Sequence, residues 1–226
     1  MKNYKYVLEW TDNLPDEKII YDCLDYAWRY TPSKNNFMNY NVHVLGPKQS
    51  HLRELLYYKC LSNQSKANGD KITNLTLLKK YEKHLLKIDQ QPQFWNVKHA
   101  PYVLIYTHRV ATELNPKQKM NISQGMVYEQ TFPVGTKKYE KAKPTAQFEA
   151  GMFAANFSSK CLENNIDTSF IACIPTSLDE WSQPEWDFVK EQPFLVQLAG
   201  FGDMYKRDIS TLSDLKPNFE KVVNVL

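Results

Sequence analysis

The polar residues best placed for ligand chemistry lie in one short turn, YTPSKNN, from Tyr30 to Asn36. Ser33 offers a hydroxyl and Asn36 offers an amide, and the turn also has backbone N–H groups. A polar turn after a helix can hydrogen-bond the edges of a bound polar ligand, although an ordinary Asx turn uses the same residue types. The residue types alone leave both interpretations open.

The familiar signatures of nucleotide binding, hydrolysis and metal binding are missing from the sequence. The seven glycines form neither G-x-G-x-x-G nor a P-loop, and neither G-x-S-x-G nor H-E-x-x-H occurs. The four cysteines contain no C-x-x-C pair, the five histidines never fall at i, i+4, and no acid–base pair of carboxylates can be assigned. We therefore expect no metal ligands and no catalytic side chain, so that a cofactor would carry any chemistry.

Composition favours an ordinary globular protein. The chain has 226 residues, of which 42% are hydrophobic, so a sizeable core can form. A net charge of +3, with lysines spread along the chain, does not suggest nucleic-acid binding. No apolar run reaches the ~18 residues of a membrane span, and the N-terminus shows no secretory signal. We expect a cytoplasmic protein in a reducing compartment, with Cys23 a buried free thiol.

The turn must be positioned by the elements on either side of it. The segment LPDEKIIYDCLDYAWRYT predicts a helix with Trp28 in its apolar stripe, ending near Thr31 because Pro32 disfavours helical backbone before it. The segment NYNVHVLG then predicts a strand with alternate residues on one face, which are Tyr40, Val42 and Val44.

The remaining pattern predicts one mixed α/β domain over residues 1–226, with a single sheet of about four strands. We expect strands at 100–108, 166–174 and 193–202, and helices at 48–61, 72–88, 145–165 and 178–190. A loop is expected at 62–70, and Leu75 and Leu86 are candidate core residues. Residues 109–144 are polar and read as irregular, and we interpret them as a flap or as a segment ordered by a partner.

The turn and its flanks, AWRYTPSKNNFMNYNVHVLG, resemble the signature of the FMN-dependent nitroreductase family, roughly A-R-x-A-P-S-x-x-N-x-Q-P-W before a strand. The residues that keep this pattern are Ala27, Arg29, Pro32, Ser33 and Asn36. The residues that replace its Gln, Pro and Trp are Met38, Asn39 and Tyr40. Further similar blocks follow in the family's order, and the resemblance spans nearly the whole chain: HAPYVLIYTH, FEAGMFAANFSSKCLENNIDTSFIAC, PFLVQLAGFGD and LKPNFEKVV.

The resemblance implies a three-layer fold with a mostly antiparallel sheet, a homodimer, and FMN bound at the dimer interface. Pro32, Ser33, Lys34 and Asn36 match the wall of the flavin site. The backbone amides of Ala172 and Cys173 match those near N5 and O4 of the ring, where a donor would stabilise the charge of hydride transfer. Lys216 matches the arginine that holds the FMN phosphate in the family.

One part of the family pattern is altered. The N-terminal R-R-S-x-R cluster is replaced by YKYVLEWTD, which leaves Lys5 as the cation there. Residues that might compensate are Arg29, Lys206 and Arg207. In place of the glycines of G-L-G stands NNID, where Asn165 suits a left-handed backbone.

These features lead us to expect an oxidoreductase in which NAD(P)H reduces FMN. A nitroaromatic, quinone-like or related small aromatic acceptor is then reduced in a ping-pong reaction, with no catalytic side chain. Two alternatives stay open. One is a protein of this fold with weak or lost flavin turnover that acts in binding or structure. The other is a dehalogenase-like or flavin-modifying relative.

Overall fold

The computed structural model describes residues 6–7, 9–33, 38–67, 69, 72–88, 94–109, 116–125, 137–171, 174, 193–202 and 207–208. Its centre is an antiparallel four-stranded sheet in the order β2-β3-β5-β4. These strands are β2 (Tyr40–Leu45), β3 (Tyr102–His108), β5 (Pro193–Gly200) and β4 (Asp167–Ile171). A second, two-stranded sheet pairs β1 (Tyr6–Val7) with β6 (Arg207–Asp208). The outer strands of the larger sheet are therefore β2 and β4, at opposite edges.

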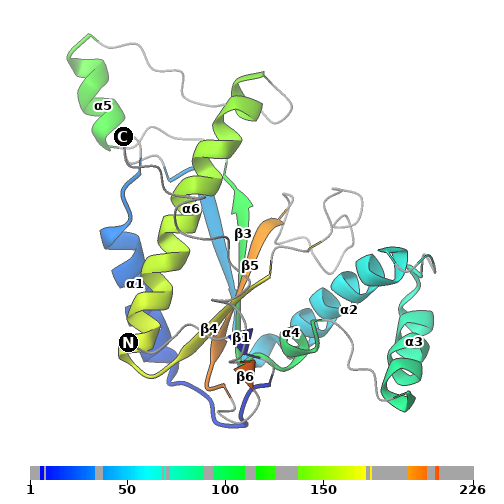
Figure 1. Cartoon of the computed structure of the whole chain (residues 1–226). Coiled ribbons are helices and arrows are strands. Elements are labelled where there is room, and N and C mark those ends of the chain that lie inside the picture. The colour runs from blue at the N-terminus through cyan, green and yellow to red at the C-terminus, as the bar shows by residue number, and fades with distance from the viewer. Residues whose placement is uncertain are drawn as a thin grey trace, which may run out of the picture.

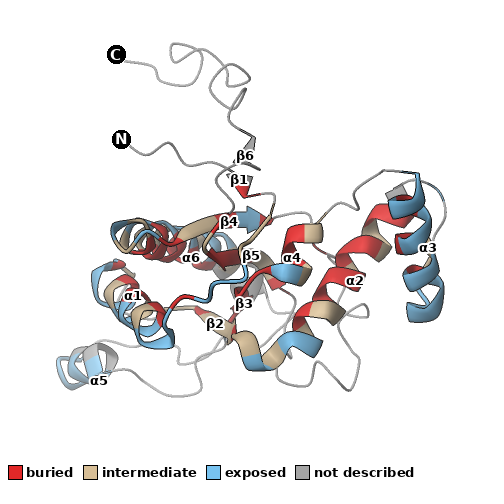
Figure 2. Cartoon of the chain, turned by 90° about the horizontal axis from the view of Figure 1, so that it is seen from below, coloured by how far each residue is buried: buried red, intermediate tan, exposed pale blue. Residues whose placement is uncertain are grey.

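Helices cover both faces of the larger sheet (Figures 1 and 2). On one face, α1 (Glu17–Tyr30) packs against α6 (Lys137–Glu163). On the other face lie α2 (Ser50–Ala67), which follows the 3-10 turn η2 (Pro47–Gln49), and α4 (Trp95–His99). Helix α3 (Leu75–Lys87) packs on α2 away from the sheet, and α5 (Pro116–Ser123) connects β3 to α6 in sequence. None of these described helices is both long and apolar enough to cross a bilayer.

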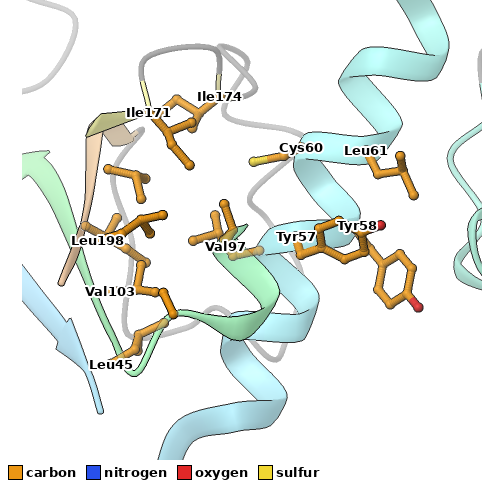
Figure 3. Close-up of a cluster of buried hydrophobic side chains, with 14 of the residues drawn as sticks. Leu45, Tyr57, Tyr58, Cys60, Leu61, Val97, Val103, Ile171, Ile174 and Leu198 are labelled. Atoms are coloured by element: carbon orange, nitrogen blue, oxygen red, sulfur yellow. The ribbon is translucent and has the colours of Figure 1, made fainter. Parts of the chain in front are cut away.

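The two faces of the sheet carry separate hydrophobic clusters because side chains alternate along each strand. All residues of β3 are buried, as expected for a central strand covered on both faces. Val103 and Ile105 belong to the cluster beneath α2 and α4, whereas Leu104 and Tyr106 belong to the cluster beneath α1 and α6. Figure 3 shows Val103 and its strand neighbours facing Val97 of α4 and the side of α2.

Local signals fix several element ends. The carboxylate of Asp16 caps α1 by accepting a hydrogen bond from the Lys18 N–H at 2.8 Å. The helix ends at Tyr30, immediately before the Thr31–Pro32 pair, as predicted. Asn165 adopts φ 59° in the connection from α6 to β4, which confirms its expected left-handed backbone. The thiol of Cys23 is buried and free, also as expected.

Several sequence predictions were wrong in detail. The helix expected to end near residue 61 continues to Ala67, so part of the expected loop at 62–70 is helical. The polar residues there turn inward: the Ser62 hydroxyl donates to the Ile72 carbonyl at 2.7 Å, and Ser65 bonds the same residue. Three predicted core residues are exposed because they flank a buried stripe: Trp28, Leu75 and Leu86.

The segment from 109 to 144 also differs from expectation in its described part. Helix α5 lies inside it, and α6 begins at Lys137 rather than near residue 145, with Pro144 inside the helix. These stretches are helical, not irregular. The proposed flap role stays a prediction, and the helix expected at 178–190 lies outside the described residues.

Candidate functional site

The polar turn lies at the end of the sheet where β2 begins. Register places Tyr40 opposite His108, the last residue of β3, and Pro193 starts β5 beside Thr107. Strand β4 also runs toward this end, because it is antiparallel to β5 and finishes at Ile171. The turn and the N-terminal half of α6 share this end of the molecule (Figure 1). Strand β4 finishes level with the middle of β2, because Ile171 pairs with Val196 of β5, which lies beside Ile105 of β3 and so in line with His43.

Ser33 is half-buried, and its hydroxyl is fixed by two hydrogen bonds. It donates to Glu149 Oε2 on α6 at 2.8 Å, and it accepts from the Met38 N–H at 2.8 Å. A serine hydroxyl has one proton and two lone pairs. Because the proton and one lone pair are already used, Ser33 can only accept a hydrogen bond from a ligand. Its partner on a ligand would therefore be an N–H or O–H group.

Glu149 is a functional candidate that the sequence analysis missed. Only 2% of the residue is exposed, although carboxylates are rarely buried without partners. Its position in the buried stripe of α6 was a usable signal, since Glu149 follows Ala146 by three residues and precedes Phe153 by four. An acidic residue on an apolar helix face indicates a specific partner, and the structure supplies Ser33.

Tyr40 stands next to this carboxylate. Burial raises the pKa of the Tyr40 hydroxyl, and the charge of Glu149 raises it further. The group is therefore a neutral hydrogen-bond donor at physiological pH. It is buried and has no hydrogen-bond partner among the described residues. Its ring packs edge-on against Phe153, with centroids 5.8 Å apart.

A groove of about 670 Å³ lies between α1, β2 and α6, and Met38, two residues beyond the turn, is part of its lining. Pro32 and Ser33 are not among its described lining residues. Its walls are mainly aromatic and apolar, and Asp22, Asp25 and Arg109 add charge. The Arg109 guanidinium donates to the Met38 carbonyl at 3.1 Å, at the boundary between the groove and the turn. The apolar and aromatic lining residues are Tyr21, Leu24, Trp28, Met38, Tyr40, Val42, Val44 and Phe153.

The structure locates only some of the predicted site residues. Pro32 is exposed and Ser33 is half-buried at the mouth of the turn. Ala172 and Cys173 directly follow Ile171, but they lie outside the described residues, as do four others: Lys5, Lys34, Asn36 and Lys216. Of the possible compensating cations, Arg29 pairs with Asp25 at 2.6 Å on the exposed face of α1. Within the described part of the chain, no group of three potential metal ligands forms.

The strands that adjoin the two predicted halves of the site in sequence lie at opposite edges of the sheet. The turn precedes β2 and the Ala172–Cys173 pair follows β4, and these strands occupy opposite edges of the sheet. Three inter-strand steps of about 4.8 Å separate the edges by about 14 Å. This span exceeds the length of an isoalloxazine ring.

Solved structures with similar folds are flavoproteins and nitroreductase-like proteins. A BluB-like flavoprotein from Clostridium difficile 630 matches with a TM-score of 0.58 at 14% identity, covering 99% of this chain and 95% of that one. A nitroreductase-like protein from Streptococcus mutans matches with a TM-score of 0.56 at 16% identity, covering 99% and 94%. The NADPH:FMN oxidoreductase from Vibrio harveyi, complexed with NAD+, matches with a TM-score of 0.55 at 11% identity, covering 98% and 73%.

Sequence comparison adds no assignment. No protein-family model matches the chain, and a search of curated protein sequences gives no match. The likeness therefore rests on tertiary structure, through the antiparallel four-stranded sheet and its two helical layers. On these grounds the chain has the fold of the nitroreductase-like flavoproteins.

Proposed function

We propose that this protein is an FMN-dependent NAD(P)H oxidoreductase that reduces a nitroaromatic, quinone-like or related aromatic acceptor by a ping-pong mechanism. FMN, when bound, supplies the hydride chemistry that no side chain of the sequence offers. One observation carries the proposal. In a chain with the nitroreductase-like fold, Met38, whose N–H is held by the Ser33 hydroxyl, lines an aromatic groove between α1, β2 and α6.

The described residues fit a flavin in shape and in hydrogen bonding. The groove volume of about 670 Å³ lies in the usual range of small-molecule pockets, roughly 300–1,000 Å³. Its aromatic and apolar walls suit a planar ring system. The free lone pair of Ser33 suits the ring N–H or a ribityl hydroxyl, rather than the ring carbonyls. We further propose as FMN contacts Pro32 and the six residues beyond the described part: Lys5, Lys34, Asn36, Ala172, Cys173 and Lys216.

The separation of the two edge strands supports a homodimer with the flavin at its interface. Within one chain, β2 and β4 lie at opposite edges of the sheet, about 14 Å apart, so a flavin against the Ser33 turn lies away from the β4 edge of the same chain. A two-fold symmetric partner can bring its own Ser33 turn to the β4 end of the first chain. Each of the two equivalent sites would then contain residues from both subunits.

The first test removes the Ser33 hydroxyl and the Asn36 amide from the turn. Replacing Ser33 and Asn36 together by alanine is expected to weaken FMN binding by about a hundredfold, since each lost hydrogen bond is worth roughly a factor of ten. The measurement is quenching of FMN fluorescence during titration of the apoprotein. A matched control replaces two exposed residues, Asn13 and Ser159, by alanine and should bind FMN like the wild type.

The possible outcomes separate the site from the function. A double variant that binds FMN as tightly as the wild type would show that the turn does not contact the flavin. A colourless wild-type protein that leaves FMN fluorescence unchanged would refute the enzyme assignment and favour the binding or structural alternative. Anaerobic titration of the yellow protein with NADH and NADPH would then identify the preferred reductant.

The dimer is tested by sedimentation of the flavin-loaded protein. We expect a particle of twice the 26.5 kDa chain mass. A holoprotein that sediments as a 26.5 kDa monomer would contradict the shared site, because one chain does not bring the two edges together.

A further inference from the structure

Two side chains of α6 hold the start of the polar turn. Glu149 accepts a hydrogen bond from the Ser33 hydroxyl at 2.8 Å, and the Asn156 amide donates to the Thr31 hydroxyl at 3.1 Å. The two α6 residues are seven positions apart, which places them on the same face of the helix, two turns from each other. The turn is therefore fixed to α6 at two points before it leaves for β2.

Arg109, the residue that follows β3, holds the segment between the turn and β2. The backbone N–H of Arg109 donates to the Asn39 carbonyl at 3.0 Å, and its guanidinium donates to the Met38 carbonyl at 3.1 Å. Met38 has φ 46°, a left-handed backbone that is costly for a residue with a side chain. Such a conformation persists only where surrounding contacts hold it, and here Arg109 and Ser33 provide them.

The Ser33 hydroxyl connects the start of the turn to Met38. Ser33 Oγ accepts a hydrogen bond from the Met38 N–H at 2.8 Å, which links two residues five positions apart. The direction of that hydroxyl depends on Glu149, which takes its only proton and so turns a lone pair toward Met38. Without the carboxylate the hydroxyl can rotate, and the loop closure weakens.

We propose that Glu149 is a positioning residue for flavin binding: it acts through Ser33 to hold the turn in the shape that contacts FMN. This inference rests on the proposed function, because the turn is taken as the flavin wall. Glu149 itself does not touch the flavin. The role follows from its burial, its bond to Ser33 and the closure of the loop by the same hydroxyl.

A double-mutant cycle on FMN affinity tests this role. Glu149→Ala and Ser33→Ala should each weaken FMN binding by about tenfold. The double variant should be no weaker than the weaker single variant, because both changes break the same link. Glu149→Gln keeps an acceptor oxygen for Ser33 and should restore affinity to within about threefold of the wild type. The control is Glu163→Ala, an exposed residue of the same helix, which should bind FMN normally.

All titrations are run below the melting temperature of the apoprotein variants, so that binding is measured on folded protein. Losses of affinity that multiply in the double variant would refute the link through Ser33, as would a Glu149→Ala variant that binds FMN like the wild type. Absence of FMN binding by the wild type is a different result. It refutes the proposed function and this inference together, whereas the first two results refute the inference alone.

Discussion

Replacing Glu82 by alanine is expected to lower the free energy of unfolding by about 3 kcal/mol. Only 6% of this residue is exposed, and its carboxylate accepts from the Tyr58 hydroxyl at 2.6 Å and from Lys98 Nζ at 2.8 Å. The Lys98 ammonium also lies 5.3 Å, 5.5 Å and 5.2 Å from the ring centroids of Tyr57, Tyr58 and Trp95. The substitution leaves this largely buried cation without its carboxylate and Tyr58 without an acceptor.

The cost is large because Glu82 joins three helices. It belongs to α3, Tyr58 to α2, and Lys98 to α4, so one carboxylate fixes the layer that covers this face of the sheet. Urea unfolding followed by circular dichroism gives the change in free energy.

The matched control is Glu54→Ala. Glu54 pairs with Lys79 at 3.7 Å, and both side chains are about half exposed, so we expect a loss of at most about 1 kcal/mol. Adding Lys98→Met to Glu82→Ala should recover part of the lost stability, because the uncompensated charge is removed as well. Equal losses for Glu54→Ala and Glu82→Ala would contradict the structural role assigned to Glu82.

Replacing Gly200 by alanine is expected to destabilise the protein by a similar amount, about 3 kcal/mol. A Cβ atom at this position would lie 2.6 Å from Pro101 Cδ and 2.9 Å from Trp10 Cε3. A proline ring cannot rotate away, and Gly200 is held in register opposite Asp167 at the end of β5. The backbone of β5 must therefore shift, and its pairing with β4 weakens.

Gly151 gives a control in which the substitution by alanine should raise, not lower, the free energy of unfolding. Gly151 lies on the exposed side of α6, and a Cβ there would meet no heavy atom within 4 Å. Gly151→Ala should raise the free energy of unfolding by about 0.5–1 kcal/mol, because alanine loses less backbone entropy in a helix. Both variants are measured by the same urea titration. A Gly200→Ala variant as stable as the wild type would show that Pro101 and Trp10 do not confine this position.

The sequence by itself determined features that depend on neighbouring residues. Alternation and apolar runs predicted the strands of the larger sheet, and Pro32 predicted the end of α1. Backbone preference predicted the left-handed Asn165. The order of the blocks that resemble the nitroreductase family led to the nitroreductase-like fold, which the structural comparisons confirm. These features are readable because the periods of helix and strand, and the backbone limits of proline and asparagine, act over a few residues.

Tertiary structure decided the features that join distant parts of the chain. Strand order placed β2, which follows the Ser33 turn, and β4 at opposite edges of the sheet. The link between Ser33 and Glu149 spans 116 positions in the sequence. Periodicity marks which residues of a helix are buried but not which partner they meet. That choice depends on how α6 packs over the sheet, which brings Glu149 within hydrogen-bonding distance of Ser33.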